Sequence, residues 1–526
     1  MSTKIQNGFF PSIYDPKKDN PHKSSISNNI ALEIFGNRFY SDQTVDEYLS
    51  EFLLVFNSPK LKNKDSEPYG SNSLSITYDT GFYRPKTRLG LKFFSFFSQS
   101  KLETRHSVHH EEFLNALELV KSKMDSYITD EEKNDLVQIL QSLLYGFIGI
   151  AKNRTWATYN FLPISPMLLG REVTWRHTTE SFNTWQDSLA NFHVGDHRFM
   201  ARGGEVLFLQ LGHLFSNIEL HQSLIRDKIL NKPQYTHLEF NLNELQTNLE
   251  DELVKLLKTE TNSIERICKF IDNALKEYDI SEADKRPATL ARIPDCYVFE
   301  AFLFANELLI LLRSNISKLE KVEFLQILCV MQVLRSIMAR SRQLDVTAPA
   351  TPGFHANYAW IACSPNSTSS DPIRKHAESS YQKNEEIIYR VLRAKGKERQ
   401  VQESDYVNID GHSLNVFKKM AKAIGLVIPI NGGHQRFVLN ANLTRLFVYT
   451  LIPDGQRIQI NELLSRIYTH FSISIFGDQL QEAMSWQYEQ LSEPTTDIKL
   501  TWFEESLRQS GLLIELSDSI SIVKNP

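Results

Sequence analysis

The chain has 526 residues, too many for a single hydrophobic core, since cores stop growing at roughly 250 to 300 residues. Hydrophobic residues make up 41% of it and charged residues 23%, a composition that excludes wholesale disorder. The formal net charge of −5 excludes a protein coated in positive potential, so any contact with nucleic acid must be local. We therefore expect several folded domains.

Cysteine usage and hydropathy predict a cytoplasmic protein. The four cysteines are widely separated and form no CxxC pair that could hold zinc, so we expect reduced thiols. Residues 1–20 lack the apolar run of a signal peptide. The most apolar stretch, 296–312, contains Glu300 and Glu307 and is shorter than the roughly 20 apolar residues that span a bilayer. We expect it to be a core helix, without membrane contact.

Apolar residues recur at helical spacing through the first two-thirds of the chain. In 42–57 they follow one another at spacings of three, one, three, one and three. Segment 129–151 opens with Thr129 and Glu132, a capping box. Its apolar stripe consists of Leu136, Ile139, Leu140, Leu143, Leu144 and Phe147. Further helical patterns cover 110–125, 204–218, 241–259, 262–278, 296–313 and 319–341.

Two segments, 57–81 and 343–372, are rich in Pro, Ser, Asn and Gly and are predicted to be loops or linkers. Strand-like alternation is scarce before residue 425, so the body should be nearly all α. The predicted domains are an N-terminal helical domain at 1–160 with the long loop 57–81, a central helical domain at 161–342, a linker at 343–372, a basic unit at 373–440 and an acidic unit at 441–526.

Two stretches near the C-terminus, 418–440 and 505–525, share one plan. In each, an amphipathic helix ends at a glycine, Gly425 or Gly511, and two short alternating strands joined by a polar turn follow. A helix that leads directly into a β-hairpin is the closing half of a winged helix. The predicted fold class is therefore mostly α: a multi-domain helical body followed by tandem winged-helix-like units.

The two C-terminal units differ in charge. Residues 373–445 contain 13 Lys or Arg against 7 Asp or Glu, a net charge of +6, whereas residues 446–526 contain 5 against 11, a net charge of −6. The basic unit could hold the phosphates of DNA or RNA, or contact protein as many winged helices do, while the acidic unit favours protein. The candidate nucleic-acid-binding residues are Lys418, Lys419, Lys422, Arg436, Arg390 and Arg393.

Potentially reactive histidines gather in the middle of the chain. His193 and His197 stand four apart, which would place two imidazoles on one helix face for a metal, near His177 and Asp196. Gly195 weakens such a helix, and no glutamate follows His193 as in a zinc protease. We favour structural histidines, and so expect no metal, no cofactor and no catalytic residue. A metal-dependent nuclease built from these residues is the alternative.

The run 82–110 interleaves Lys and Arg with Phe93, Phe94, Phe96 and Phe97. Cationic grooves with stacking rings bind single-stranded nucleic acid in this way. The alternative, which we favour, is that the phenylalanines belong to the core and the cations line the exterior, because contiguous aromatic side chains are costly to expose.

A resemblance to a known family rests on two segments, GNRFYSDQTVDEYLSEFLLVFNSPK (36–60) and LTRLFVYTLIPDGQRIQINELLSRIYTHFSISI (443–475). They resemble accessory proteins encoded in multigene bacterial anti-phage defence islands, of the Druantia or methylation-associated kind. The resemblance implies a cytoplasmic subunit that works beside a helicase or ATPase, and it carries no active-site residues. The sequence also lacks a P-loop, a GxGxxG after a strand and a GxSxG elbow. We favour a non-catalytic adaptor or nucleic-acid-binding subunit of an antiviral defence complex, with a nuclease or a transcriptional regulator as alternatives.

Overall fold

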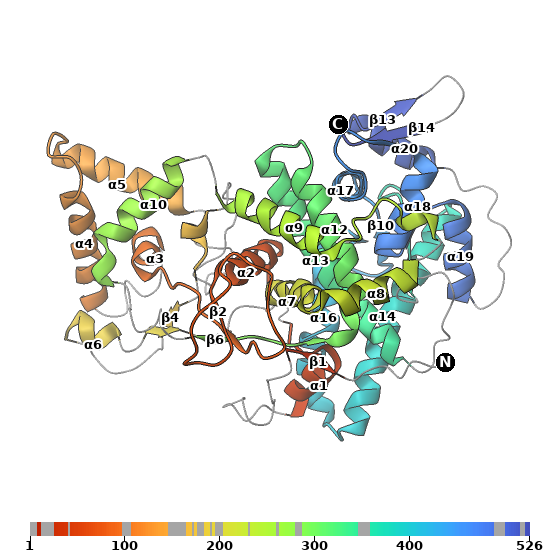
Figure 1. Ribbon diagram of the computed structural model, residues 1–526, viewed down its shortest axis with the longest axis horizontal. Helices are drawn as coiled ribbons and strands as arrows, with labels where there is room; N and C mark the ends of the chain where they lie inside the picture. Colours follow the sequence, from red (N-terminus) through yellow and green to blue (C-terminus); the bar gives the residue numbers. More distant parts are fainter. Residues whose placement is uncertain are drawn as a thin grey trace. The chain divides into compact units, whose positions relative to one another are not determined.

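Figure 1 shows a computed structural model of the protein. It describes residues 8–11, 26–39, 43–96, 107–145, 165–170, 173–175, 183–189, 192–194, 203–229, 232–258, 262–278, 287–345, 358–488, 500–515 and 521–526. Over these residues the chain is mostly helical with short strands, which confirms that part of the predicted fold class.

The chain forms two compact units, each assembled from separated stretches. The larger unit comprises 1–45, 209–252 and 291–526, and the smaller unit comprises 46–208 and 253–290. These units differ from the predicted domains, because residues of the predicted central domain, 161–342, contribute to both. Hydrophobic spacing shows which face of a helix is buried but not which other helix covers it.

The smaller unit combines helices with short antiparallel strands. Its helices are α2 (Val45–Asn57), α3 (Leu89–Phe96), α4 (Ser107–Ser122), α5 (Asp130–Tyr145), α6 (Trp185–Leu189) and α10 (Asn262–Ala274). Its strands are β2 (Lys60–Leu61), β3 (Phe82–Tyr83) and β6 (Ala288–Thr289) in one sheet, and β4 (Val173–Trp175) with β5 (Phe192–Val194) in another. The expected capping box starts α5, where the Thr129 N–H donates to the Glu132 carboxylate at 2.8 Å.

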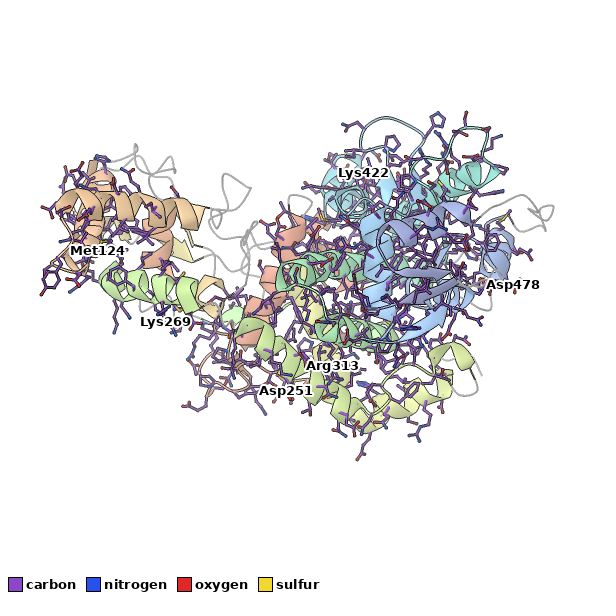
Figure 2. All side chains as sticks on the ribbon, turned by 90° about the horizontal axis from the view of Figure 1, so that it is seen from above. Met124, Asp251, Lys269, Arg313, Lys422 and Asp478 are labelled. Carbon is purple, nitrogen blue, oxygen red and sulfur yellow. The ribbon has the colours of Figure 1, made fainter. Side chains whose placement is uncertain are left out.

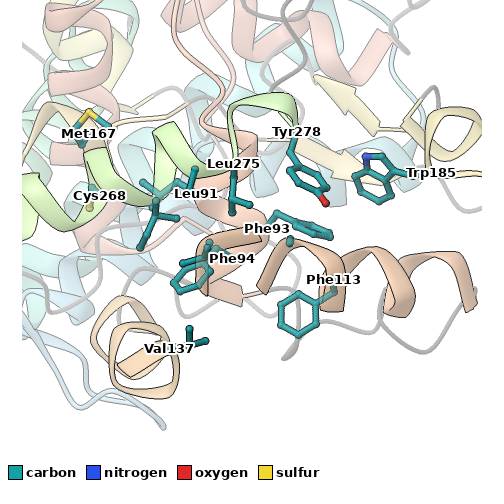
Figure 3. Close-up of a cluster of buried hydrophobic side chains, with 14 residues drawn as sticks. Leu91, Phe93, Phe94, Phe113, Val137, Met167, Trp185, Cys268, Leu275 and Tyr278 are labelled. Atoms are coloured by element: carbon teal, nitrogen blue, oxygen red, sulfur yellow. The ribbon is translucent and has the colours of Figure 1, made fainter. Parts of the chain in front are cut away.

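An aromatic cluster forms the core between α3, α4, α5 and α10 (Figure 3). Phe93 packs against Phe113, Trp185 and Tyr278, with ring centroids 5.1 to 6.0 Å apart, and Phe94 is buried beside it. Phe93 and Phe94 of the basic run are therefore core residues, as we favoured. The side chains of Phe96 and Phe97 lie outside the described residues.

The predicted loop 57–81 is fixed at its start by a buried ammonium group. The Lys60 side chain is inaccessible to solvent, and its Nζ donates to four backbone carbonyl oxygens at 2.7 to 3.3 Å, those of Phe56, Ser58, Gly70 and Ser73. A buried charge is tolerated only when it is fully hydrogen-bonded. Residues 70 and 73 are thus tied back to the end of α2.

The larger unit contains the most apolar helices. Its elements before the C-terminal region are β1 (Phe9–Phe10), α1 (Ile26–Phe35), most of α7 (Gly203–Ser216), α8 (Ile218–Ile229), the first part of α9 (Leu242–Leu257), β7 (Ile293–Pro294), α12 (Val298–Arg313) and α13 (Lys318–Leu344). Helices α12 and α13, which correspond to the predicted helices 296–313 and 319–341, pack together. Among the described residues only α13 is long and apolar enough to cross a membrane, and 89% of its most apolar window is buried inside the protein, as in a core helix.

The C-terminal region of the larger unit contains two sheets. Its helices are α14 (Pro372–Glu398), α15 (Tyr406–Gly411), α16 (Leu414–Ala423), α17 (Ala441–Leu451), α18 (Ile460–Phe471), α19 (Gly477–Tyr488) and α20 (Thr501–Gln509). One sheet has the order β12 (Ile473–Ser474), β8 (Trp360–Cys363), β10 (Arg436–Val438), β9 (Val427–Ile428), and the other has the order β11 (Arg457–Gln459), β14 (Ser521–Lys524), β13 (Leu513–Glu515). Both predicted helix-ending glycines adopt a positive φ, 72° at Gly425 and 70° at Gly511.

The prediction of a linker at 343–372 is wrong for β8, whose four residues are buried in the middle of a sheet. Composition hid this strand, because four apolar residues stand between stretches rich in Pro, Ser and Asn. Its neighbours β10 and β12 also lie far along the chain, in the two different predicted C-terminal units. These units therefore share one sheet.

Helix α13 offers a matched pair of sites for testing the core. Leu328 is fully buried, whereas Leu319 on the same helix is 59% exposed. Leu328→Asp should leave mostly insoluble protein, because a carboxylate would be buried without a partner. Leu319→Asp should stay soluble with a nearly unchanged melting temperature. The test measures the soluble fraction and the circular dichroism spectrum of both variants. A folded Leu328→Asp protein would contradict the core position of α13.

Candidate functional site

The three predicted recognition lysines lie on α16, the helix before the β9–β10 hairpin. Lys418 forms an ion pair with Glu385 of α14. The exposed Lys419 donates to the backbone carbonyl of Gln43 at 3.4 Å. Lys422, labelled in Figure 2, is half-exposed and has no ion pair with a carboxylate within the part of the chain that the structure describes. The lysines that face solvent at this helix are therefore Lys419 and Lys422.

The two predicted arginines of α14 hold the fold together. Arg390 lies 2.7 Å from the buried carboxylate of Asp345. Arg393 donates hydrogen bonds from both terminal nitrogens to Asp410 of α15 at 2.8 Å. Its guanidinium lies 4.1 Å from the ring centroids of Tyr389 and Tyr406. The hydrogen bonds to Asp410 raise the pKa of Arg393. A bidentate, stacked arginine of this kind positions helices, and its charge is largely balanced locally.

Arg436 was predicted to be a wing arginine, and the structure places it in strand β10 with only 7% of its surface exposed. It donates to the backbone carbonyl of Pro365 at 3.4 Å. The exposed tip of the hairpin consists instead of residues 430–434. Together with Lys418, Lys419, Arg390 and Arg393, this makes five of the six predicted cations that bind internal acceptors. Binding of nucleic acid by the six stays a prediction.

The acidic unit comprises, in chain order, α17, β11, α18, β12, α19, α20 and the β13–β14 hairpin. Strand β11 pairs antiparallel with β14, and β14 pairs antiparallel with β13. Helix α20 packs against α17 and leads directly into the hairpin. On its surface Arg508 pairs with Glu505, so the single arginine of this helix is already balanced.

Of the predicted histidine cluster, the structure describes only His193. His193 lies in strand β5, opposite Thr174 of β4, so the helical spacing on which the metal-site alternative depends is wrong. His177, Asp196 and His197 lie outside the described residues. Among the residues that the structure describes, no group of three or more His, Cys, Asp or Glu side chains could hold a metal ion.

Sequence reasoning missed a buried polar chain that links four elements of the larger unit. Arg335 of α13 donates to both carboxylate oxygens of Glu307 on α12, at 2.9 and 2.6 Å. His470 of α18 donates from Nδ1 to Glu307 at 2.9 Å, and its Nε2 lies 3.1 Å from Nε2 of His237. Glu307 and His470 are inaccessible to solvent and Arg335 nearly so. The only available signal was the presence of charged residues in apolar helices, which require partners.

The protonation states follow from this geometry. Burial acts to raise the pKa of Glu307, but Arg335 and His470 hold it below its usual range, so Glu307 is ionised. Burial outweighs Glu307 and lowers the pKa of His470. Burial, followed by His470 and Arg466, lowers the pKa of His237 to about 2. Both histidines are therefore neutral at pH 7. His470 can then donate from Nδ1 to Glu307 and accept at Nε2 from His237 without adding a charge.

These histidines should make stability depend on pH. Because the pKa of His237 is lower in the folded chain than in the unfolded chain, the unfolded state gains a proton below about pH 6.5 that the folded state does not. Stability is therefore full above that pH and falls on acidification. His237→Asn should reduce the loss of unfolding free energy between pH 6 and 5 by roughly 1.4 kcal/mol per pH unit, measured by urea unfolding. The control His110→Asn, at an exposed site, should behave like the unmodified chain, and equal slopes in both variants would refute this.

Comparison of the chain with models of protein families, with curated proteins and with solved structures found no match. These comparisons therefore carry over no family, activity or partner to the chain. The functional argument depends on what the described residues can do. These residues form a C-terminal region with two helix–hairpin units and contrasting charge.

Proposed function

We propose that this protein is a non-catalytic adaptor that contacts other macromolecules through two winged-helix-like units at its C-terminus. The strand order β11–β14–β13 is the main support. In a winged helix, a strand that follows the first helix pairs with the last strand of the closing hairpin. Strand β11 likewise follows α17 and pairs with β14, and α20 takes the position of the third helix.

The basic unit has a related but different arrangement. Strand β8 lies beside β10 as β11 lies beside β14, yet it runs parallel to its neighbour and precedes α14 instead of following it. The helix–hairpin half, α16 with β9 and β10, keeps the expected form. The likeness of this unit to a winged helix therefore depends mainly on its closing half.

Charge favours protein partners for both units. The acidic unit, with its net charge of −6, repels phosphate. In the basic unit the carboxylates of Glu385, Asp345 and Asp410 balance Lys418, Arg390 and Arg393. A cation that is already paired inside the protein gains little from a phosphate, because the internal pair must be broken or shared.

A nucleic-acid contact is the second candidate function, and Lys419 and Lys422 favour it. They lie three residues apart on α16, where the Lys419 side chain is exposed and the Lys422 side chain is half-exposed. Two phosphate contacts would steer the unit toward a duplex but would give weak binding, since affinity grows with the number of phosphates neutralised.

The resemblance to accessory proteins of anti-phage islands suggests the setting for this adaptor. We propose that it works in the bacterial cytoplasm as one subunit of a defence complex, next to a helicase or ATPase subunit. The adaptor would supply contacts, and its partner would supply the chemistry.

Salt-dependent gel shifts separate the two candidate functions. If the basic unit contacts protein, the full chain should bind a DNA duplex no more tightly than non-specifically, with a Kd of roughly 10⁻⁴ to 10⁻⁶ M, and Lys419→Ala/Lys422→Ala should scarcely alter binding. Strong binding that this double variant weakens would favour nucleic acid instead, with the slope of log affinity against log salt reduced by about 0.9 per lysine. Lys418→Ala, which removes a paired lysine, is the matched control.

A plaque assay tests the adaptor role. Asp478 and Glu505 are exposed side chains of the acidic unit, on α19 and α20. Asp478→Lys/Glu505→Lys should abolish protection against phage and release the partner on size-exclusion chromatography, because charge reversal replaces attraction with repulsion. Lys397→Glu reverses the charge of an exposed side chain in the basic unit. This variant should still protect against phage, because the contact made by the acidic unit is unchanged. Full protection by the double variant would contradict a role for this surface.

A further inference from the structure

The outer face of α5 presents apolar side chains to solvent. Ile139 is 60% exposed and Leu136 is 37% exposed, whereas Val137 points into the aromatic core and is 3% exposed (Figure 3). Leu136 and Ile139 stand three residues apart and lie on one side of the helix. The apolar stripe of α5 is thus wider than the core that it covers, and part of it is left at the surface.

Acidic side chains surround this exposed pair. Glu131, Glu132 and Asp135 are all exposed, and Glu132 and Asp135 each lie one helical turn before an apolar member of the pair. Glu131 and Asp135 stand four residues apart, an arrangement in which like charges repel. Residues 107–145, which comprise α4, α5 and their connection, contain 8 Asp or Glu against 3 Lys or Arg, a net charge of −5.

We propose that this acidic–apolar face of α5, formed by Glu131, Glu132, Asp135, Leu136 and Ile139, docks a basic amphipathic helix of a partner protein. Apolar residues of that helix at a spacing of three or four would cover Leu136 and Ile139. Its Lys or Arg side chains would lie beside Glu131 and Asp135 and relieve their repulsion. Such complementarity of apolar stripe and opposite charge is the usual basis for helix recognition by a helical surface.

The same charge disfavours other occupants. A second copy of this chain would bring an identical acidic face and repel the first. Nucleic acids and anionic lipid surfaces carry the same sign of charge as the face and would be repelled as well. A cationic, partly apolar helix meets both requirements of the surface.

This surface is a second contact of the chain, and it does not depend on the C-terminal units. Its variants lie in α5, whereas those that test the proposed function lie in 397–505. Failure of one set of experiments therefore leaves the other intact.

The test uses the full chain and a fluorescent synthetic helix of Lys and Leu, about 18 residues long, with leucines at helical spacing. Fluorescence anisotropy should show binding that weakens as salt rises from about 50 to about 300 mM. Leu136→Ser/Ile139→Ser should weaken binding at least about tenfold. Glu131→Gln/Asp135→Asn should weaken it at low salt and flatten the salt dependence. All four side chains are exposed, so melting temperatures should be unchanged.

The matched control is Leu220→Ser/Leu224→Ser on α8, which removes leucines that are 50% and 48% exposed from another helix. It should bind the peptide as the unmodified chain does. Equal weakening by both leucine pairs, or no binding at about 100 μM peptide, would overturn the proposal. So would binding of a matched Glu and Leu peptide, or a dimer that only Leu136→Ser/Ile139→Ser dissociates, which would assign the face to a second copy.

Discussion

The buried ion pair between Glu307 and Arg335 is the constraint on which the larger unit depends. Two charges without access to solvent are costly, and that cost is offset only when the charged groups are paired and hydrogen-bonded to their neighbours. Here His470 supplies the missing donor to Glu307, and its own carbonyl accepts from Arg335. Since His470 belongs to α18, the C-terminal region must dock in one register on α12 and α13, or leave the carboxylate short of partners.

The same use of charge for internal fixation extends to the basic unit. Arg390 and Arg393 join α14 to Asp345 and Asp410, which lie in different elements, and the sequence gives no sign of these pairs. A net charge of +6 over 373–445 therefore overstates how much positive surface a phosphate would meet. The carboxylates of Glu131 and Asp135 on α5 differ in this respect, because they are exposed beside apolar side chains, where a partner can reach them.

These surfaces together favour a protein whose function is contact. On our proposals, the C-terminal unit of net charge −6 and the acidic–apolar helix face would both select partners with basic groups by complementary charge. The buried histidines add no reactive centre of their own, since neutral imidazoles within a core stabilise packing. An adaptor requires mainly rigid elements that present such surfaces to its partners.

The sequence by itself determined where many of the helices lie and how some of them begin or end. The predicted helix 319–341 is α13 (Lys318–Leu344), Gly425 and Gly511 end their helices as expected, and Thr129 caps α5, because spacing, glycine φ angles and capping side chains are local properties. Only the tertiary structure decided that β8 joins β10 and β12, that Arg436 is buried, and that Glu307 meets His470 across 163 positions of the chain. Such pairings join residues distant in sequence, and hydrophobic periodicity fixes which face is buried but not against which element or charge.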